Sequence, residues 1–222
     1  MTAPYLSLLL ADGRLPTGAH TQSAGVEPAF QAGMAVSAVP DYLTVRLRTV
    51  TEVEAATAVL ARRTWLDGAP DRLAGLVTLD AAWRARTVSD VLRDAADLLG
   101  RSYLRLAAAV WDLAALVGAG RVWCRAVVVG VTAAEAGLSA AETARLVAFE
   151  DVQTVLAAAL KLAPFDPALG VAWAVRAQPE VEGLVARVAD LTRAADLPAP
   201  TAPLLEQWGQ QHRDSERRLF RA

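Results

Sequence analysis

The sequence predicts an all-α protein, built as a single-domain bundle of about eight to ten helices. Apolar residues recur at helical spacing along most of the 222 residues, and no segment alternates convincingly with the period of two of a half-buried strand. Alanine, the best helix former, supplies much of the 54% hydrophobic content. Because this content is high for a soluble chain, we expect part of it to cover a subunit or partner interface.

The first half of the chain contains five expected helices, at 4–11, 23–32, 41–66, 71–84 and 89–117. The helix at 89–117 has a plausible N-cap in Ser89 and a plausible C-cap in Gly118. Its apolar residues step by four and three, which places them on one helix face: Leu99, Tyr103, Leu106, Val110, Leu113 and Val117.

The second half begins with a β-branched run at 126–131, which we assign to a helix because no partner strand exists elsewhere. Ser139 and Glu142 form a capping box, and the helix that they start runs to Leu162, before Pro164. Apolar residues surround most of this helix, so we expect it to be central. Further helices are expected at 167–177, 179–195 and 203–213.

The domain organisation follows from one proline-rich stretch. The heptapeptide at 197–203 contains three prolines, Pro198, Pro200 and Pro203, and is expected to form an extended spacer. We therefore divide the chain into an all-α domain at 1–196, a linker at 197–203 and a C-terminal segment at 204–222.

Composition excludes several classes of protein. A net charge of −2 argues against nucleic-acid binding, and no apolar run approaches the roughly 18–20 residues of a membrane span. The single cysteine, Cys124, excludes an intrachain disulfide and is expected in the core. Phosphate-binding loops and zinc motifs are absent, so no cofactor is expected. These features fit a cytoplasmic protein.

The C-terminus carries the most informative feature of the chain. A polar run at 210–217 precedes Arg218, Leu219, Phe220 and Arg221. The polar run has too little apolar surface to order by itself, whereas Phe and Arg are enriched in interface cores. The segment is therefore predicted to become ordered when it binds a partner. The alternative is a frayed terminus in which Leu219 and Phe220 are adjacent by chance.

The connection at 14–27 is long, polar and glycine-containing. One interpretation is a turn between helices, with Ser23 as an N-cap and Gly18 in the left-handed conformation. The alternative is a small helical hydrolase or metal-dependent enzyme centred on His20, Ser23 and Glu27. Because no Gly-x-Ser-x-Gly elbow is present, we favour the turn.

Lys161 is the only lysine in a chain whose other basic residues are arginines. It ends the expected central helix, where a cation interacts favourably with the helix dipole. An ammonium differs physically from a guanidinium, so a partner contact is the second interpretation.

Together these segments resemble the UreF family of urease accessory proteins. The resemblance lies in Leu9 to Gly18 followed by Ser23-x-Gly25-Val26-Glu27, in 99–106, in 151–164 and in the Arg-Leu-Phe-Arg ending. The set occurs in the family's order and extends over the whole chain. The sequence departs from the family pattern at Gln22, where an aromatic residue or histidine is usual.

The resemblance implies an all-α homodimer that catalyses no reaction itself. Such a protein bridges a UreD-type (UreH-type) scaffold and the GTPase UreG, regulates the GTPase, and assists nickel insertion into apo-urease; nickel passes only transiently. Arg218, Leu219, Phe220 and Arg221 are the expected contacts for the UreD-type partner. Further candidates, for partner or dimer contacts or a polar metal route, are Arg14, Thr17, Gly18, His20, Glu27 and Lys161.

Overall fold

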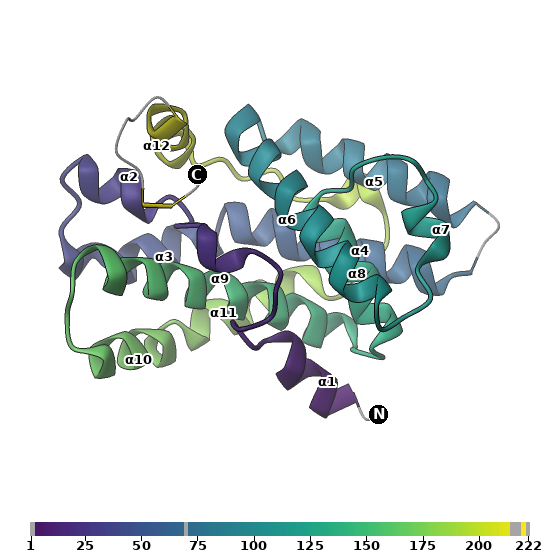
Figure 1. The fold of residues 1–222 in the computed structure, drawn as a ribbon, viewed down its shortest axis with the longest axis horizontal. Helices are drawn as coiled ribbons and strands as arrows, with labels where there is room; N and C mark the ends of the chain where they lie inside the picture. Colours follow the sequence, from purple (N-terminus) through teal and green to yellow (C-terminus); the bar gives the residue numbers. More distant parts are fainter. Residues whose placement is uncertain (1–2, 69–70, 214–218, 221–222) are drawn as a thin grey trace.

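The computed structural model describes residues 3–68, 71–213 and 219–220, in which all regular secondary structure is helical. Figure 1 shows an elongated bundle, which confirms the predicted all-α fold class. Its α-helices are α1 (Ala3–Leu10), α2 (Val26–Gln31), α3 (Val39–Leu47), α4 (Val50–Leu66), α5 (Arg72–Arg86), α6 (Asp90–Ala108), α7 (Ala114–Val117), α8 (Arg125–Glu135), α9 (Ala140–Leu162), α10 (Pro167–Arg176), α11 (Gln178–Val188) and α12 (Pro203–Arg213). Short 3-10 helices are η1 (Ala19–Thr21), η2 (Val36–Ala38) and η3 (Ala194–Asp196).

Helix α9 is the central element, as the sequence predicts. It packs against α1, α2, α3, α4, α8, α10 and α11. The predicted capping box is present, because Ser139 Oγ accepts from the Glu142 amide and the Glu142 carboxylate accepts from the Ser139 amide. Since α9 contacts most of the other helices, side chains at different positions along α9 reach different parts of the molecule.

Helices α4 and α8 pack unusually closely. Ala58 and Ala61 on α4 are fully buried, and a Cβ at Gly130 on α8 would lie 2.2 Å from the Ala58 carbonyl oxygen. The helical assignment of the run at 126–131 is confirmed. Its continuous apolar character reflects burial of nearly the whole of α8, rather than a strand.

Two long predicted helices are each divided in the structure. The helix expected at 41–66 breaks at Thr49, whose φ of −131° and ψ of −98° lie outside the helical region, so α3 and α4 are separate. The helix expected at 89–117 ends at Ala108, and Asp112 then accepts from the Ala114 amide at the start of α7. Val110 is consequently exposed rather than part of one apolar face.

Two further boundaries differ from the predictions. The helix expected at 179–195 ends at Val188, and residues 194–196 form η3. The helix expected at 23–32 begins only at Val26, with Gly25 rather than Ser23 as its N-cap. Gly25 has φ of 80°, a left-handed conformation that favours glycine and reverses the chain before α2. Gly18 is also left-handed, with φ of 84°, as predicted.

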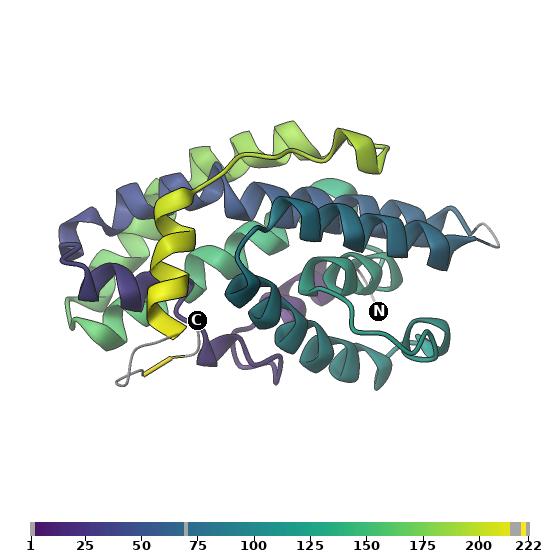
Figure 2. The same ribbon diagram turned by 90° about the horizontal axis from the view of Figure 1, so that it is seen from above.

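Helix α12 has the predicted bounds, 203–213, and lies against α2 and α6 (Figures 1 and 2). The residues before it, 197–202, contain no helix and run along the bundle in Figure 2. The Arg86 Nε donates to the Leu197 carbonyl, and Leu197 and Ala202 are buried. The division into a domain, a linker and a segment that orders on a partner remains a prediction.

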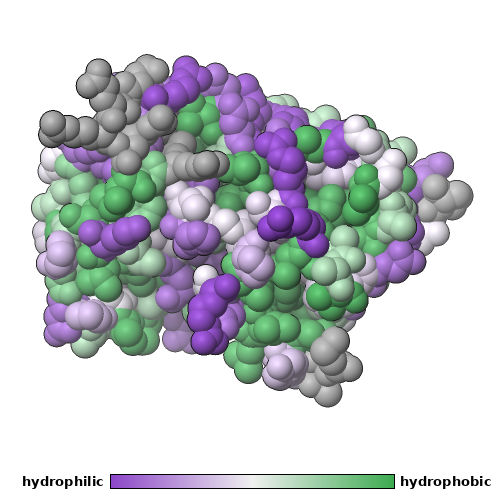
Figure 3. Space-filling model, viewed as in Figure 1, coloured by the Kyte–Doolittle hydropathy of each residue, from purple (hydrophilic) through white to green (hydrophobic). Residues whose placement is uncertain are grey.

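Several large apolar side chains are exposed on the surface of the bundle. They include Tyr5 and Leu8 on α1 and Val171 and Val175 on α10. Figure 3 shows hydrophobic residues gathered over the region of α1.

None of the helices within the described residues is long and apolar enough to cross a membrane. Cys124 is buried in the core, as predicted, and burial raises the pKa of its thiol.

The close contact of α8 with α4 predicts the effect of a single methyl group. Replacing Gly130 by Ala should lower the free energy of unfolding by about 1–3 kcal/mol, because a Cβ there meets backbone that cannot move aside. Urea unfolding measures this change. Gly183→Ala on α11 is the matched control, since its Cβ would meet only the flexible end of Arg187. An equal response of the two variants would contradict the packing.

Candidate functional site

The end of the described chain is bound to the first turn of α2. The Glu27 carboxylate accepts hydrogen bonds from two consecutive backbone amides, Leu219 at 2.7 Å and Phe220 at 2.9 Å. Glu27 is only 4% exposed, and a carboxylate in the first turn also interacts favourably with the helix dipole. Charge-assisted bonds of this kind are stronger than neutral ones, so Glu27 fixes the backbone at 219–220.

Two more side chains complete the site that holds Phe220. His212 on α12 is fully buried, with Nε2 3.3 Å from the Phe220 carbonyl oxygen and 3.4 Å from Glu27 Oε2. The Lys161 ammonium lies 4.8 Å from the centroid of the Phe220 ring. We call Glu27, Lys161 and His212 the C-terminal seat. It joins α2, α9 and α12 through the last described residue.

The two described tail residues are oriented differently. Phe220 is 7% exposed, whereas Leu219 beside it is 55% exposed. The seat therefore buries the aromatic side chain and leaves the leucine side chain outside. Of the predicted tail contacts, Arg218 and Arg221 lie outside the described residues.

The structure thus brings together some of the predicted site residues and separates others. Glu27, Lys161 and Phe220, which are far apart in the sequence, meet at the seat. Lys161 does end its helix as expected. The remaining candidates lie on the loop before α2: Thr17 is buried, Gly18 lies against α6, and Arg14 and His20 are exposed. Their roles toward a partner remain predictions.

Arg14 forms a local ion pair with Asp12. Its guanidinium lies 2.6 Å from the Asp12 carboxylate, and this pairing lowers the pKa of Asp12 to about 2. The Arg14 side chain is 90% exposed. The pair therefore stays in solvent, where such interactions contribute little to stability.

The hydrolase alternative does not match the geometry of the loop. His20 is exposed, Ser23 is completely buried, and the Glu27 carboxylate is occupied by the tail amides. No hydrogen bond links His20, Ser23 and Glu27 to one another within the described part of the chain. A nucleophile and its base need such contact, so these three residues do not form a catalytic unit.

A buried ion pair joins α3 to α9. Arg46 on α3 forms two hydrogen bonds to Asp151 on α9, at 2.6 and 3.0 Å, and the Thr51 hydroxyl donates to the same carboxylate. Arg46 also donates to the Ala24 carbonyl oxygen, as does the Tyr42 hydroxyl. This network therefore fixes the turn that leads into α2 and Glu27.

The pKa of Asp151 reflects this pairing. Burial alone would raise it, but the Arg46 guanidinium and the Thr51 hydroxyl outweigh burial and hold it below its usual value. Burial also raises the pKa of Tyr42 to about 12, so its hydroxyl remains a donor to Ala24.

A second buried group contains two carboxylates and one guanidinium. Arg125 on α8 lies 2.5 Å from Glu150 and 3.5 Å from Glu54, while the Trp83 indole donates to Glu54 at 2.8 Å. Burial raises the pKa of both carboxyl groups, and Arg125 offsets this only in part. The two groups lie on either side of a cavity.

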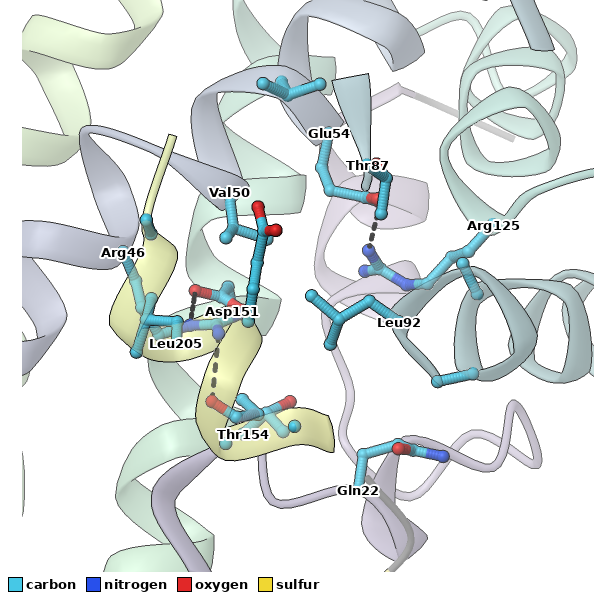
Figure 4. A pocket seen from close by; sticks show the side chains of 18 of the residues that line it. Gln22, Arg46, Val50, Glu54, Thr87, Leu92, Arg125, Asp151, Thr154 and Leu205 are labelled. Carbon is cyan, nitrogen blue, oxygen red and sulfur yellow. Dashed lines mark hydrogen bonds and ion pairs between the residues drawn. The ribbon is translucent and has the colours of Figure 1, made fainter. Parts of the chain in front are cut away.

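This cavity of about 160 Å³, which we call the polar chamber, lies between α4, α6, α8, α9 and α12. Figure 4 shows Gln22 on one side and Glu54 with Arg125 on the other. Leu92 and Leu205 form part of the apolar lining of the chamber. Its polar lining consists of Gln22, Arg46, Glu54, Arg86, Thr87, Arg125, Glu150, Asp151, Thr154 and Glu206. No group of three potential metal ligands from His, Cys, Asp and Glu occurs among the described residues.

Sequence reasoning missed this chamber, apart from noting Gln22. The available signal was the presence of charged residues within otherwise apolar helices, such as Arg125 before 126–131 and Glu150-Asp151 within the central helix. Buried charges need partners, so such residues indicate an internal network. The sequence alone does not show which residue pairs with which, because partners can lie far apart in the chain, as Arg46 and Asp151 do at 105 positions.

Comparison with known proteins places the chain among relatives of one kind. The family model UreF matches residues 35–178. A urease accessory protein UreF from Mycolicibacterium vanbaalenii is 36% identical over 215 residues, which cover 96% of each chain. The proteins of the same name from Mycobacterium marinum and Mycobacterium tuberculosis are 34% and 31% identical, each over 99% of both chains.

The C-terminal seat predicts a measurable dependence of the tail on Glu27. Replacing Glu27 by Ala should accelerate hydrogen exchange at the Leu219 and Phe220 amides by roughly tenfold or more, because both lose their acceptor. Asp41→Ala is the control, since Asp41 also lies in the first turn of a helix but is exposed. Unchanged exchange at both amides in Glu27→Ala would contradict the seat.

Proposed function

Because the chain belongs to the UreF family of urease accessory proteins, we propose that it is an adaptor in urease maturation. In this role it bridges a UreD-type scaffold protein and a UreG-type GTPase, regulates the GTPase, and assists nickel insertion into apo-urease. The chain itself catalyses no reaction on this proposal, and nickel is cargo that passes transiently. The setting is the cytoplasm, and the protein functions as a homodimer.

The observation that carries this proposal is the arrangement of the seated tail. Glu27 holds the backbone at 219–220, and Phe220 is anchored between α2, α9 and α12. The Leu219 side chain is left 55% exposed on this fixed backbone. A segment held in one conformation loses less entropy on binding, so the seat favours recognition of the tail by a partner.

The exposed apolar surface supports the adaptor role as well. A bridging protein needs more than one interface, and apolar patches on the surface mark such interfaces. Tyr5 and Leu8 on α1 and Val171 and Val175 on α10 lie on helices other than those of the seat. We therefore assign the tail to the UreD-type partner and leave these helices for the second copy or the GTPase. The loop residues Arg14, Thr17, Gly18 and His20 are secondary candidates for the same contacts.

The adaptor proposal predicts separate effects of two changes in the tail. Deleting residues 218–222 should abolish the complex with the UreD-type protein and leave the fold intact. Leu219→Ala should weaken that complex by about tenfold or more, since truncation of an interface anchor typically costs over 1 kcal/mol. Size-exclusion chromatography with light scattering detects the complex, and calorimetry gives its Kd.

Leu204→Ala provides the matched control, because Leu204 on α12 is a leucine with the same 55% exposure. It should bind as the unmodified chain does. Full binding by the deletion variant would overturn the assignment of the tail. Failure of the unmodified chain to associate with either UreD- or UreG-type protein would overturn the adaptor proposal itself.

A further inference from the structure

The polar chamber contains a buried amide with no partner. Gln22 is 6% exposed and lines the chamber, and neither its Oε1 nor its Nε2 has a hydrogen-bond partner among the described residues. Figure 4 shows Gln22 on the side of the pocket opposite Glu54 and Arg125. Leaving a buried amide unpaired costs free energy, so this position favours a polar occupant that the amide can bind.

The charges around the chamber are unequal. The lining carries four carboxylates, from Glu54, Glu150, Asp151 and Glu206, and three guanidiniums, from Arg46, Arg86 and Arg125. Arg46 and Asp151 satisfy each other through two hydrogen bonds. Arg125 is shared by Glu150, which it contacts closely, and Glu54, from which it lies 3.5 Å away. The lining thus has one more carboxylate than it has guanidiniums, and Glu54 shares its guanidinium with Glu150.

From this arrangement we propose that the polar chamber is a binding site for a small cation that carries N–H donors, such as ammonium or methylammonium. The Glu54 carboxylate supplies the compensating charge, and Gln22 Oε1 supplies a second acceptor. A volume of about 160 Å³ holds such an ion together with water, and that water accepts from Gln22 Nε2. This inference stands independently of the adaptor role.

Other ligand chemistries fit the lining less well. An inorganic anion would meet an excess of carboxylates. A transition metal ion prefers several strong ligands in one place, and the described residues offer no group of three. The carboxylates and amide oxygen instead present separate acceptors, which matches a cation with several N–H groups. Burial raises the pKa values of Glu54 and Glu150, and the Arg125 guanidinium offsets this only in part.

Access to the site depends on α12. Leu205, Glu206 and Gly209 of this helix line the chamber. The helix is held at one end by Gln210 and Arg213, which bond to Asp90, and by His212 at the C-terminal seat. A ligand as small as ammonium requires only local movement of these side chains.

The test compares two cations of equal charge on the full chain. Thermal unfolding is followed with ammonium chloride and with tetramethylammonium chloride at the same concentrations, since the second cation has no N–H donor. We expect Tm to depend on ammonium only: above the Kd for ammonium, Tm should rise by roughly 3–5 °C for each tenfold increase in its concentration. Equal responses to the two salts would overturn the proposal.

Two variants locate the effect. Glu54→Gln removes the charge but keeps an acceptor for the Trp83 indole, and it should abolish the difference between the two salts. Gln22→Leu should weaken ammonium binding by roughly tenfold, through loss of one acceptor. Glu182→Gln, at an exposed carboxylate paired with Arg145, should respond as the unmodified chain does. An ammonium response that persists undiminished in Glu54→Gln would contradict the site, whether or not Gln22→Leu folds.

Discussion

The buried ion pair between Arg46 and Asp151 is the interaction on which the rest of the structure depends. Two largely desolvated charges are stable in a core only when each is fully bonded. Arg46 meets this need through Asp151 and the Ala24 carbonyl, and Asp151 through Arg46 and Thr51. The pair thereby ties α3 and α9 to the turn before α2. Both the C-terminal seat and the polar chamber are built around that turn.

Local signals in the sequence predicted much of the fold, and the failures are also physical. The capping box at Ser139 and the bounds of α12 follow from nearest neighbours in the chain, so they were predictable. The break at Thr49 has no proline or glycine to mark it, and tertiary packing decides it. At Ser23, side-chain preference favoured an N-cap, but the left-handed Gly25 provides the start of α2 instead.

The candidate site shows the same division. The composition of the tail singled out Phe220, and unusual chemistry singled out Lys161, but their contact through α9 is a property of the folded chain. The polar chamber is harder to predict from the sequence, because its charged residues come from six helices, α3, α4, α5, α8, α9 and α12. Only the folded structure shows that Asp151 has a closely bonded guanidinium, whereas the guanidinium nearest Glu54 lies 3.5 Å away. A rigid, buried framework thus positions two surfaces of different chemistry, an anchored tail outside and an acidic chamber inside.

A double-mutant cycle at Arg46 and Asp151 tests the central role of the ion pair most directly. Urea unfolding would be measured for Arg46→Met, Asp151→Leu and the double variant. The account predicts a loss of about 3–5 kcal/mol in each single variant, because each leaves one charge buried and unpaired, and a much smaller loss in the double variant than the sum. Losses that add to within about 0.5 kcal/mol would show that the two residues are not coupled, and would contradict the account.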